Sequence, residues 1–149
     1  MKKYILFGLT FLLILSCGKK EESKTENEQP PVSMVDENPL TEKIERGKQI
    51  YDKTCLSCHQ ADGVGVPNTF PPLAKSDYLN ADVNKVIDGL IHGNQGEMVV
   101  NGVTYNGVMP PQALSDEEMA DVLTYVYNSW ENNPQEVTTE MVAARRIPN

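Results

Sequence analysis

The chain has 149 residues and a formal net charge of −8, with 13 Lys and Arg against 21 Asp and Glu. This acidic balance argues against nucleic-acid binding. It fits a protein partner that is basic around its docking site, and equally a chain that is simply soluble. Once the N-terminal segments described next are set aside, about 110 residues remain, enough for one small domain.

The first 16 residues are typical of a secretory signal peptide. Met1-Lys2-Lys3 is positively charged, and the apolar run from Tyr4 to Leu15 is too short to span a bilayer comfortably. We therefore expect export of the domain.

The end of this segment, Ile14-Leu15-Ser16-Cys17, resembles the lipobox of bacterial lipoproteins. The resemblance implies that Cys17 is lipidated and anchors the chain to a bacterial membrane, on the periplasmic or cell-surface face. The alternative is an ordinary secreted protein with an unmodified Cys17. Residues 17–40 are polar and charged and cannot bury enough apolar surface to offset their ordering entropy. They are predicted to form a disordered tether.

Residues 41–54 are predicted to form the first helix of the domain, with Thr41 as N-cap. Ile44, Gly47, Ile50 and Tyr51 recur at helical spacing and define one face. Because glycine costs about 1 kcal/mol in a helix interior, Gly47 indicates a close approach of another backbone.

Cys55-Leu56-Ser57-Cys58-His59 follows directly, and C-x-x-C-H is the pattern of c-type haem attachment. Two thiols at this spacing can add to the two vinyl groups of one haem, and the adjacent imidazole can bind its iron. A redox dithiol would require a strand–helix–strand context, which the surrounding pattern lacks. A zinc site would require a second ligand pair, and the remaining candidates are the distant Cys17 and a lone His92. We expect one covalent haem c and hence electron transfer.

The positions of Gly and Pro and the spacing of apolar residues predict the elements that come next in the chain. Residues 60–73 read as a loop, residues 77–79 as a helical turn and residues 80–93 as a helix. Asn101-Gly102 between β-branched residues predicts a hairpin within 98–109.

The last main helix is predicted over residues 115–130. Ser115 and Glu118 form a potential capping box at its start. Residues 133–149 are predicted to leave the domain as a tail, with one short surface helix over 138–146.

Residues 41–132 resemble class I cytochrome c in the order of their elements. A first helix is followed by C-x-x-C-H, a Pro-rich loop, a middle helix, a loop that contains Met109 and a final helix. Residues 70–73, 105–111, 114–118 and 137–146 are similar to small cytochromes that are fused to, or accompany, dehydrogenases, nitrite reductases and terminal oxidases. The resemblance implies an all-α fold wrapped around one haem, with a small β-hairpin before the axial Met loop.

The resemblance also implies the roles of individual residues. Cys55 and Cys58 would form thioethers, and His59 would be the proximal iron ligand. The Pro71 carbonyl would accept the second ring N–H of His59, as such ligands usually require. Leu73 would pack on the haem.

Met109 is the favoured sixth ligand, because Pro110-Pro111 can hold its loop rigidly and the last helix follows. A Met sulfur raises the reduction potential. The alternatives are that Met109 only fills the core, that Met98 takes its place, or that His92 binds the iron, while Met119 is expected to face the core from a helix. Tyr78 or Tyr105 could hydrogen-bond a propionate.

The leading hypothesis is a membrane-tethered, single-haem electron carrier without catalysis of its own. It would exchange electrons with a quinol-oxidising complex, a terminal oxidase or reductase, or a dehydrogenase. Two alternatives remain: a haem-relay subunit of a larger oxidoreductase complex, and a ligand-binding haem protein with a displaceable sixth ligand.

Overall fold

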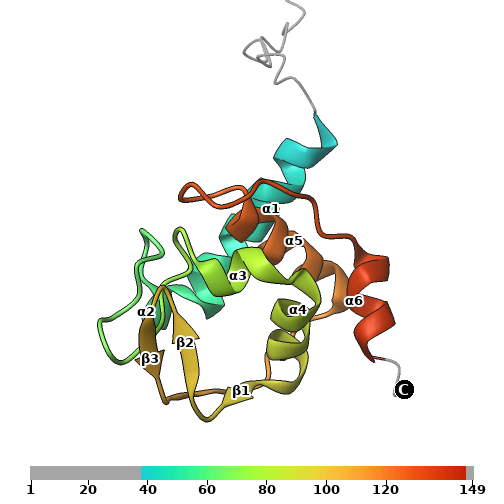
Figure 1. Cartoon of the computed structure of the whole chain (residues 1–149). Helices are drawn as coiled ribbons and strands as arrows, with labels where there is room; N and C mark the ends of the chain where they lie inside the picture. The colour runs from blue at the N-terminus through green and yellow to red at the C-terminus, as the bar shows by residue number, and fades with distance from the viewer. Residues whose placement is uncertain (1–37, 147–149) are drawn as a thin grey trace, which may run out of the picture. The chain divides into compact units, whose positions relative to one another are not determined.

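The computed structural model describes residues 38–146, and Figure 1 shows how its helices and short strands are arranged. The predicted signal peptide, Cys17 and the predicted tether up to residue 37 lie outside the described residues. In chain order the elements are α1 (Pro39–Thr54), α2 (Leu56–His59), α3 (Asp77–Ala81), α4 (Val83–His92), β1 (Asn94–Gln95), β2 (Met98–Val100), β3 (Val103–Tyr105), β4 (Val108–Met109), α5 (Asp116–Tyr127) and α6 (Thr139–Arg146).

Helix α1 begins two residues earlier than predicted, so Thr41 is not its N-cap and the helix includes the last two residues of the expected tether. Asn38 caps the helix, and its side chain accepts the N–H of Leu40 at 3.1 Å. Pro39 suits the first helical turn, because its φ is fixed near the helical value and its missing N–H is not needed there.

Helices α1 and α5 cross closely at Gly47, where the sequence predicted the close approach of another backbone (Figure 1). A Cβ built on Gly47 would lie 2.0 Å from the backbone oxygen of Asp121. Beside this contact, the buried Asp121 carboxylate accepts the Nε–H of Arg46 at 2.7 Å. The crossing therefore depends on the absence of a side chain at Gly47 and on the ion pair between Arg46 and Asp121.

The helical turn predicted at 77–79 is present as α3, which runs on to Ala81, and the helix predicted over 80–93 begins only at Val83. Asp82 interrupts them with extended backbone, and its side chain accepts the N–H of Asn84 at 2.9 Å. An N-cap within the apolar pattern explains why the spacing alone did not reveal the break.

The predicted hairpin is present as β2 and β3, joined by Asn101-Gly102. Both turn residues have positive φ, of 51° and 76°, as a two-residue turn of this kind requires. A second antiparallel pair joins β1 to β4 and places Asn94 opposite Met109.

Helix α5 starts with the predicted capping box between Ser115 and Glu118. It ends at Tyr127, three residues before the predicted end. The side-chain amides of Asn128 and Asn132 donate to the carbonyls of Thr124 and Val126, at 2.8 and 2.9 Å. These amides provide hydrogen-bond donors for carbonyl groups of the last turn, so the chain can leave the helix without leaving them unpaired.

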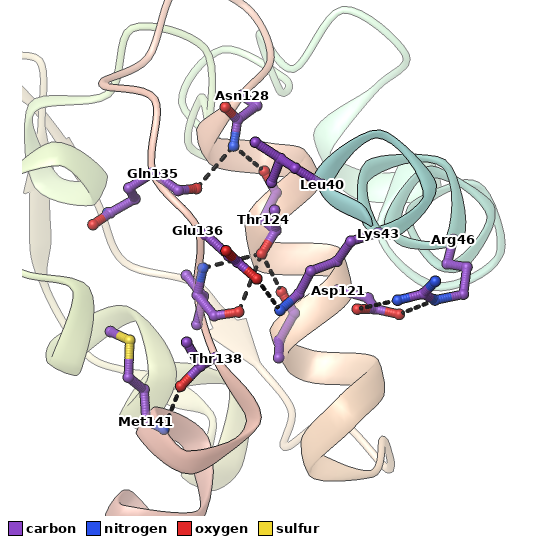
Figure 2. Close-up of polar contacts among 12 residues, drawn as sticks. Leu40, Lys43, Arg46, Asp121, Thr124, Asn128, Gln135, Glu136, Thr138 and Met141 are labelled. Atoms are coloured by element: carbon purple, nitrogen blue, oxygen red, sulfur yellow. Dashed lines mark hydrogen bonds and ion pairs between the residues drawn. The ribbon is translucent and has the colours of Figure 1, made fainter. Parts of the chain in front are cut away.

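The C-terminal tail packs into the core, so the prediction that it leaves the domain was wrong. Val137 and Val142 are fully buried, and they join the same hydrophobic cluster as Tyr51 and Leu123. Figure 2 shows the segment leading to α6 lying against α5, where the buried hydroxyl of Thr124 accepts the N–H of Val137 at 3.0 Å. The short helix itself is present, starting one residue later than predicted.

Charged side chains also hold this tail to the rest of the domain. Lys43 of α1 pairs with Glu136 at 3.0 Å (Figure 2), and Arg145 of α6 forms a two-point contact with Asp88 of α4. Among residues 38–146, no helix is both long and apolar enough to cross a bilayer.

Candidate functional site

The C-x-x-C-H motif lies where α1 passes into the short helix α2. Cys55 ends α1, with its N–H bonded to the Tyr51 carbonyl at 2.9 Å, and its own carbonyl accepts the N–H of His59 at 3.0 Å. Neither Cys55 nor Cys58 forms a disulfide, and both are half-buried. Burial raises the pKa of the Cys55 thiol, although its contact with Thr54 works in the opposite direction. The helical backbone thus holds both sulfurs and the imidazole on one short segment.

The His59 ring is buried and fixed by a backbone carbonyl. Its Nδ1 lies 3.0 Å from the Pro71 oxygen, the atom that the resemblance implied. Burial lowers the pKa of His59 and outweighs the opposing effect of this hydrogen bond. A neutral imidazole whose Nδ1–H is donated to Pro71 keeps the Nε2 lone pair for a metal ion.

The loop after His59 is tied to the helix by backbone hydrogen bonds. The N–H of Gly65 donates to His59, and the N–H of Leu73 donates to Gly63 at 2.7 Å. Gly63 has φ of 69°, and a Cβ there would lie within 3 Å of the Trp130 ring. The loop can therefore turn closely enough to bring Pro71 back over His59.

A cavity of about 340 Å³ opens next to the motif, within the size range of cofactor sites. No Asp, Glu, Lys or Arg is among its lining residues. They are Thr54, Cys55, Ser57, Cys58, His59, Thr69, Phe70, Pro71, Pro72, Leu73, Ser76, Tyr78, Val86, Leu90, Asn94, Met98, Val100, Tyr105, Gly107, Val108, Met109, Pro110 and Gln112.

A smaller apolar cavity of about 50 Å³ shares several of these residues, including Cys55, His59, Leu73 and Met109. Two thiols, an imidazole and the thioethers of Met98 and Met109 therefore line apolar space that a flat, largely apolar ring system can occupy. This donor set fits a haem: sulfur atoms for the covalent links, and nitrogen and sulfur atoms for the iron.

The segment that carries Met109 is held by few contacts. The β1–β4 ladder is two residues long, and the Asn94 amide lies 3.9 Å from the Met109 sulfur. On the other side, the N–H of Gln112 donates to Leu90 at 2.8 Å and its side chain donates to Pro110 at 2.6 Å.

The other candidate ligands and haem contacts differ in whether they line the cavities. Met98, Tyr78 and Tyr105 line the cavity. His92 is exposed and lines neither cavity, while Met119 is fully buried and also lies outside both. Among residues 38–146, no three His, Cys, Asp or Glu gather to hold a metal ion, so the zinc interpretation has no second ligand pair there.

Two asparagines that the sequence did not predict also help to form the site. Asn94 lines the cavity beside Met109. The buried Asn132 donates to the Leu73 carbonyl at 3.0 Å and accepts from Asn80 at 3.3 Å, linking the haem loop to α3. Neither sits in a motif or a periodic pattern; a polar residue in a loop gives no sign of its long-range partners.

A family comparison agrees with this geometry: the model of the family described as cytochrome c matches residues 44–130, more than half of the chain. The chain belongs to the cytochrome c family. Covalent haem c is therefore its cofactor, haem-based electron transfer is its function, and the predicted class I cytochrome c fold is confirmed.

Several relatives of this cytochrome c are known. Cytochrome c-552 of Thermus thermophilus is 42% identical over 89 residues, covering 56% of this chain and 67% of the relative. Cytochrome c-554(548) of Halomonas halodenitrificans is 31% identical, covering 52% of this chain and 86% of the relative. The cytochrome c subunit of a quinone-dependent alcohol dehydrogenase from Gluconobacter oxydans is 31% identical, covering 58% of this chain but 19% of that subunit.

Proposed function

We propose that this cytochrome c is a one-electron carrier whose iron is held by His59 and Met109, and that it exchanges electrons with redox proteins and catalyses no reaction of its own. The supporting observation is that both side chains line the same cavity beside the two thiols. The haem supplies a one-electron ferric/ferrous couple. The protein contributes the fixed orientation of His59 through Pro71 and a largely apolar wall, which favours a high potential by excluding water.

The lining also supports the proposal that the protein is a carrier rather than an enzyme. Acid–base chemistry on a bound substrate needs a positioned proton donor or acceptor, most often His, Asp, Glu or Lys. The residues lining the two cavities include no carboxylate and no lysine, and His59 is engaged with Pro71. An iron with two protein ligands leaves no position for a substrate.

The decisive test is the far-red absorption of the ferric protein, produced with a haem c maturation system. A sulfur-to-iron charge-transfer band that disappears in Met109→Ala establishes His59/Met109 ligation. Met98→Ala is the matched control, because Met98 lines the same cavity, and it should keep the band. A wild-type protein without the band, or a band lost in Met98→Ala alone, would overturn Met109 as ligand.

A second candidate function is a relay subunit within a dehydrogenase complex. The observation that favours it is the similarity to the cytochrome c subunit of an alcohol dehydrogenase. A relay subunit should co-purify with a partner in fixed stoichiometry at physiological salt. A carrier should elute alone and reduce or oxidise its partner in a salt-dependent bimolecular reaction.

The proposed location is the outer side of a bacterial membrane, with a lipid on Cys17 and residues 18–37 as tether. Its support is the sequence of the first 17 residues. Metabolic labelling with an alkyne fatty acid should mark the wild-type protein, and Cys17→Ser should abolish the label and release the holo-cytochrome from the membrane. A soluble, unlabelled wild-type protein would contradict the anchor.

A further inference from the structure

Helix α6 ends in two neighbouring arginines that bind different parts of the domain. Arg145 donates to both carboxylate oxygens of Asp88 in α4, from Nε at 2.8 Å and from Nη2 at 2.5 Å. Arg146 donates from Nε to the Asp116 carboxylate and from Nη2 to the Leu114 carbonyl at 3.0 Å. Two consecutive side chains therefore link α4 to the start of α5.

These attachment points flank the chain segment that carries Met109. Asp88 lies in the second half of α4, and Asp116 is the first residue of α5. Residues 93–115 between the two helices contain all four short strands and line much of the larger cavity. None of the α6 residues lines either cavity, so α6 joins the two ends of this segment without forming part of the cavity wall.

Helix α6 is itself fixed to the core. It packs against both α4 and α5 (Figure 1), and its Val142 is fully buried. Leu114, whose carbonyl Arg146 binds, also lines the smaller cavity together with His59 and Met109. A displacement of this end of the segment would therefore change the wall next to both proposed ligands.

The link between the two ends affects how readily the segment opens. Near its base the segment is closed by the two-residue β1–β4 ladder and by the N–H of Gln112, which donates to the Leu90 carbonyl at 2.8 Å. Backbone contacts as few as these allow local opening at a low free-energy cost. The arginine contacts raise this cost, because charge-assisted hydrogen bonds on both sides of α6 must break before the ends can separate.

We propose that Arg145 and Arg146 are positioning residues that hold the two ends of the Met109 segment together and so keep the sixth coordination position closed to small ligands. This inference rests on the proposed ligation by Met109. It deepens the proposed carrier function, because a sixth position that opens readily would bind ligands instead. A small ligand reaches the iron only in the open state, so its apparent affinity is its intrinsic affinity multiplied by the open fraction.

The test uses imidazole as the small ligand and the ferric holo-protein with both Arg145→Gln and Arg146→Gln. We expect the far-red band to remain without imidazole and the apparent affinity for imidazole to rise about tenfold, in proportion to the open fraction. Amide hydrogen exchange should accelerate at Gln112. It should stay unchanged at Cys55, whose N–H donates to the Tyr51 carbonyl within the His59 side.

Two control variants separate this effect from a general loss of stability. Lys43→Gln breaks the ion pair that joins Glu136 of the tail to α1, but it leaves both ends of the Met109 segment in place. Tyr51→Phe removes a hydrogen bond to the Gln60 carbonyl on the His59 side and lowers the global stability. Neither variant should change the apparent affinity for imidazole.

Asp88→Asn removes the Arg145 ion pair from the opposite partner and decides the question if the double arginine variant fails to bind haem. It should raise the apparent affinity for imidazole about threefold, as Arg145→Gln alone should. Combining Asp88→Asn with Arg145→Gln should give no further increase, because both substitutions remove the same contact.

The outcomes separate the two proposals. A wild-type band together with an unchanged imidazole affinity in the double arginine variant and in Asp88→Asn overturns the role of the arginines alone. An equal rise in Lys43→Gln or Tyr51→Phe also overturns that role, because the effect would then follow general destabilisation. The absence of the band from the wild-type protein overturns Met109 ligation, and the role of the arginines with it.

Discussion

The two sides of the haem cavity differ in how firmly they are held. The His59 side (residues 55–73) is part of a helix and a tightly bonded loop, and it rests on the crossing of α1 and α5. The Met109 side (residues 94–112) consists of two-residue strands, prolines and a few isolated hydrogen bonds. The structure therefore combines a segment that can open only with the core, on the His59 side, with a segment that can open locally, on the side of the proposed ligand Met109.

The largest expected effect on the His59 side is loss of haem binding in His59→Ala. His59 is the one imidazole that lines the cavity within residues 38–146. We expect no low-spin haem spectrum and little covalent haem on a haem-stained gel. His92→Ala is the matched control: it removes an exposed imidazole and should keep the wild-type spectrum. A wild-type spectrum in His59→Ala would remove His59 from the iron.

The next effect concerns the helix crossing that supports this side. Gly47→Ala places a methyl 2.0 Å from the Asp121 backbone oxygen, and we expect it to lower the free energy of unfolding by about 3 kcal/mol. The same substitution at Gly107, where the methyl would lie 3.5 Å from Thr69, should cost less than about 0.5 kcal/mol. Denaturant unfolding followed by circular dichroism measures both. Equal stability of the two variants would show that the helices can separate at little cost.

A smaller loss is expected from Tyr51→Phe. The Tyr51 hydroxyl is buried and donates to the Gln60 carbonyl at 2.7 Å, directly after His59. Leaving that carbonyl without a partner should cost about 1–2 kcal/mol of global stability, with the far-red band retained. Tyr125→Phe serves as control, because its hydroxyl makes no hydrogen bond to residues 38–146. If Tyr51→Phe lost the band before it unfolded, the two sides would not differ as described.

A substitution on the Met109 side should promote local opening rather than lower the global stability. Gln112→Leu removes the donor to the Pro110 carbonyl and should favour local opening by about 1 kcal/mol, with little change in global stability. On heating, the far-red band should then disappear well below the temperature at which helicity is lost. Simultaneous loss of both signals would mean that the Met109 side opens only with the whole domain.

The smallest effect lies at the tail, where Arg145 lowers the pKa of Asp88. Because the folded pKa is depressed, this stabilisation is present above the unfolded Asp value of about 3.9 and is lost as the pH falls through the folded value. The pair is partly exposed, so Arg145→Ala should lower the free energy of unfolding only slightly at pH 7. The difference from wild type should vanish below the folded pKa. Lys53→Ala is the control; Lys53 forms no ion pair within residues 38–146.

The elements that could be predicted are those that local chemistry determines. C-x-x-C-H, the hairpin at Asn101-Gly102 and the cap at Ser115 each depend on neighbouring residues, so the sequence displays them directly. Gly47 was informative because a glycine within a helix has a cost that only a close contact explains.

What could not be predicted depends on partners far apart in the chain. The amide of Asn132 and the short strand at Asn94 have no periodic signature, and the burial of Val137 follows a polar segment that reads as a linker. The ends of helices were also missed where a side chain such as Asn38 or Asp82 competes with the backbone pattern. Such contacts become visible only once the tertiary structure is known.

The buried tail also bears on the order in which this protein is completed. A chain is synthesised from its N-terminus, so Cys55, Cys58 and His59 emerge well before Val137 and Val142, which close the same core. Until those two valines dock, the hydrophobic core that they share with Tyr51 and Leu123 lacks part of its apolar side chains. Docking of α6 against α4 and α5 therefore completes the core from the C-terminal end of the chain, after the attachment segment has been made.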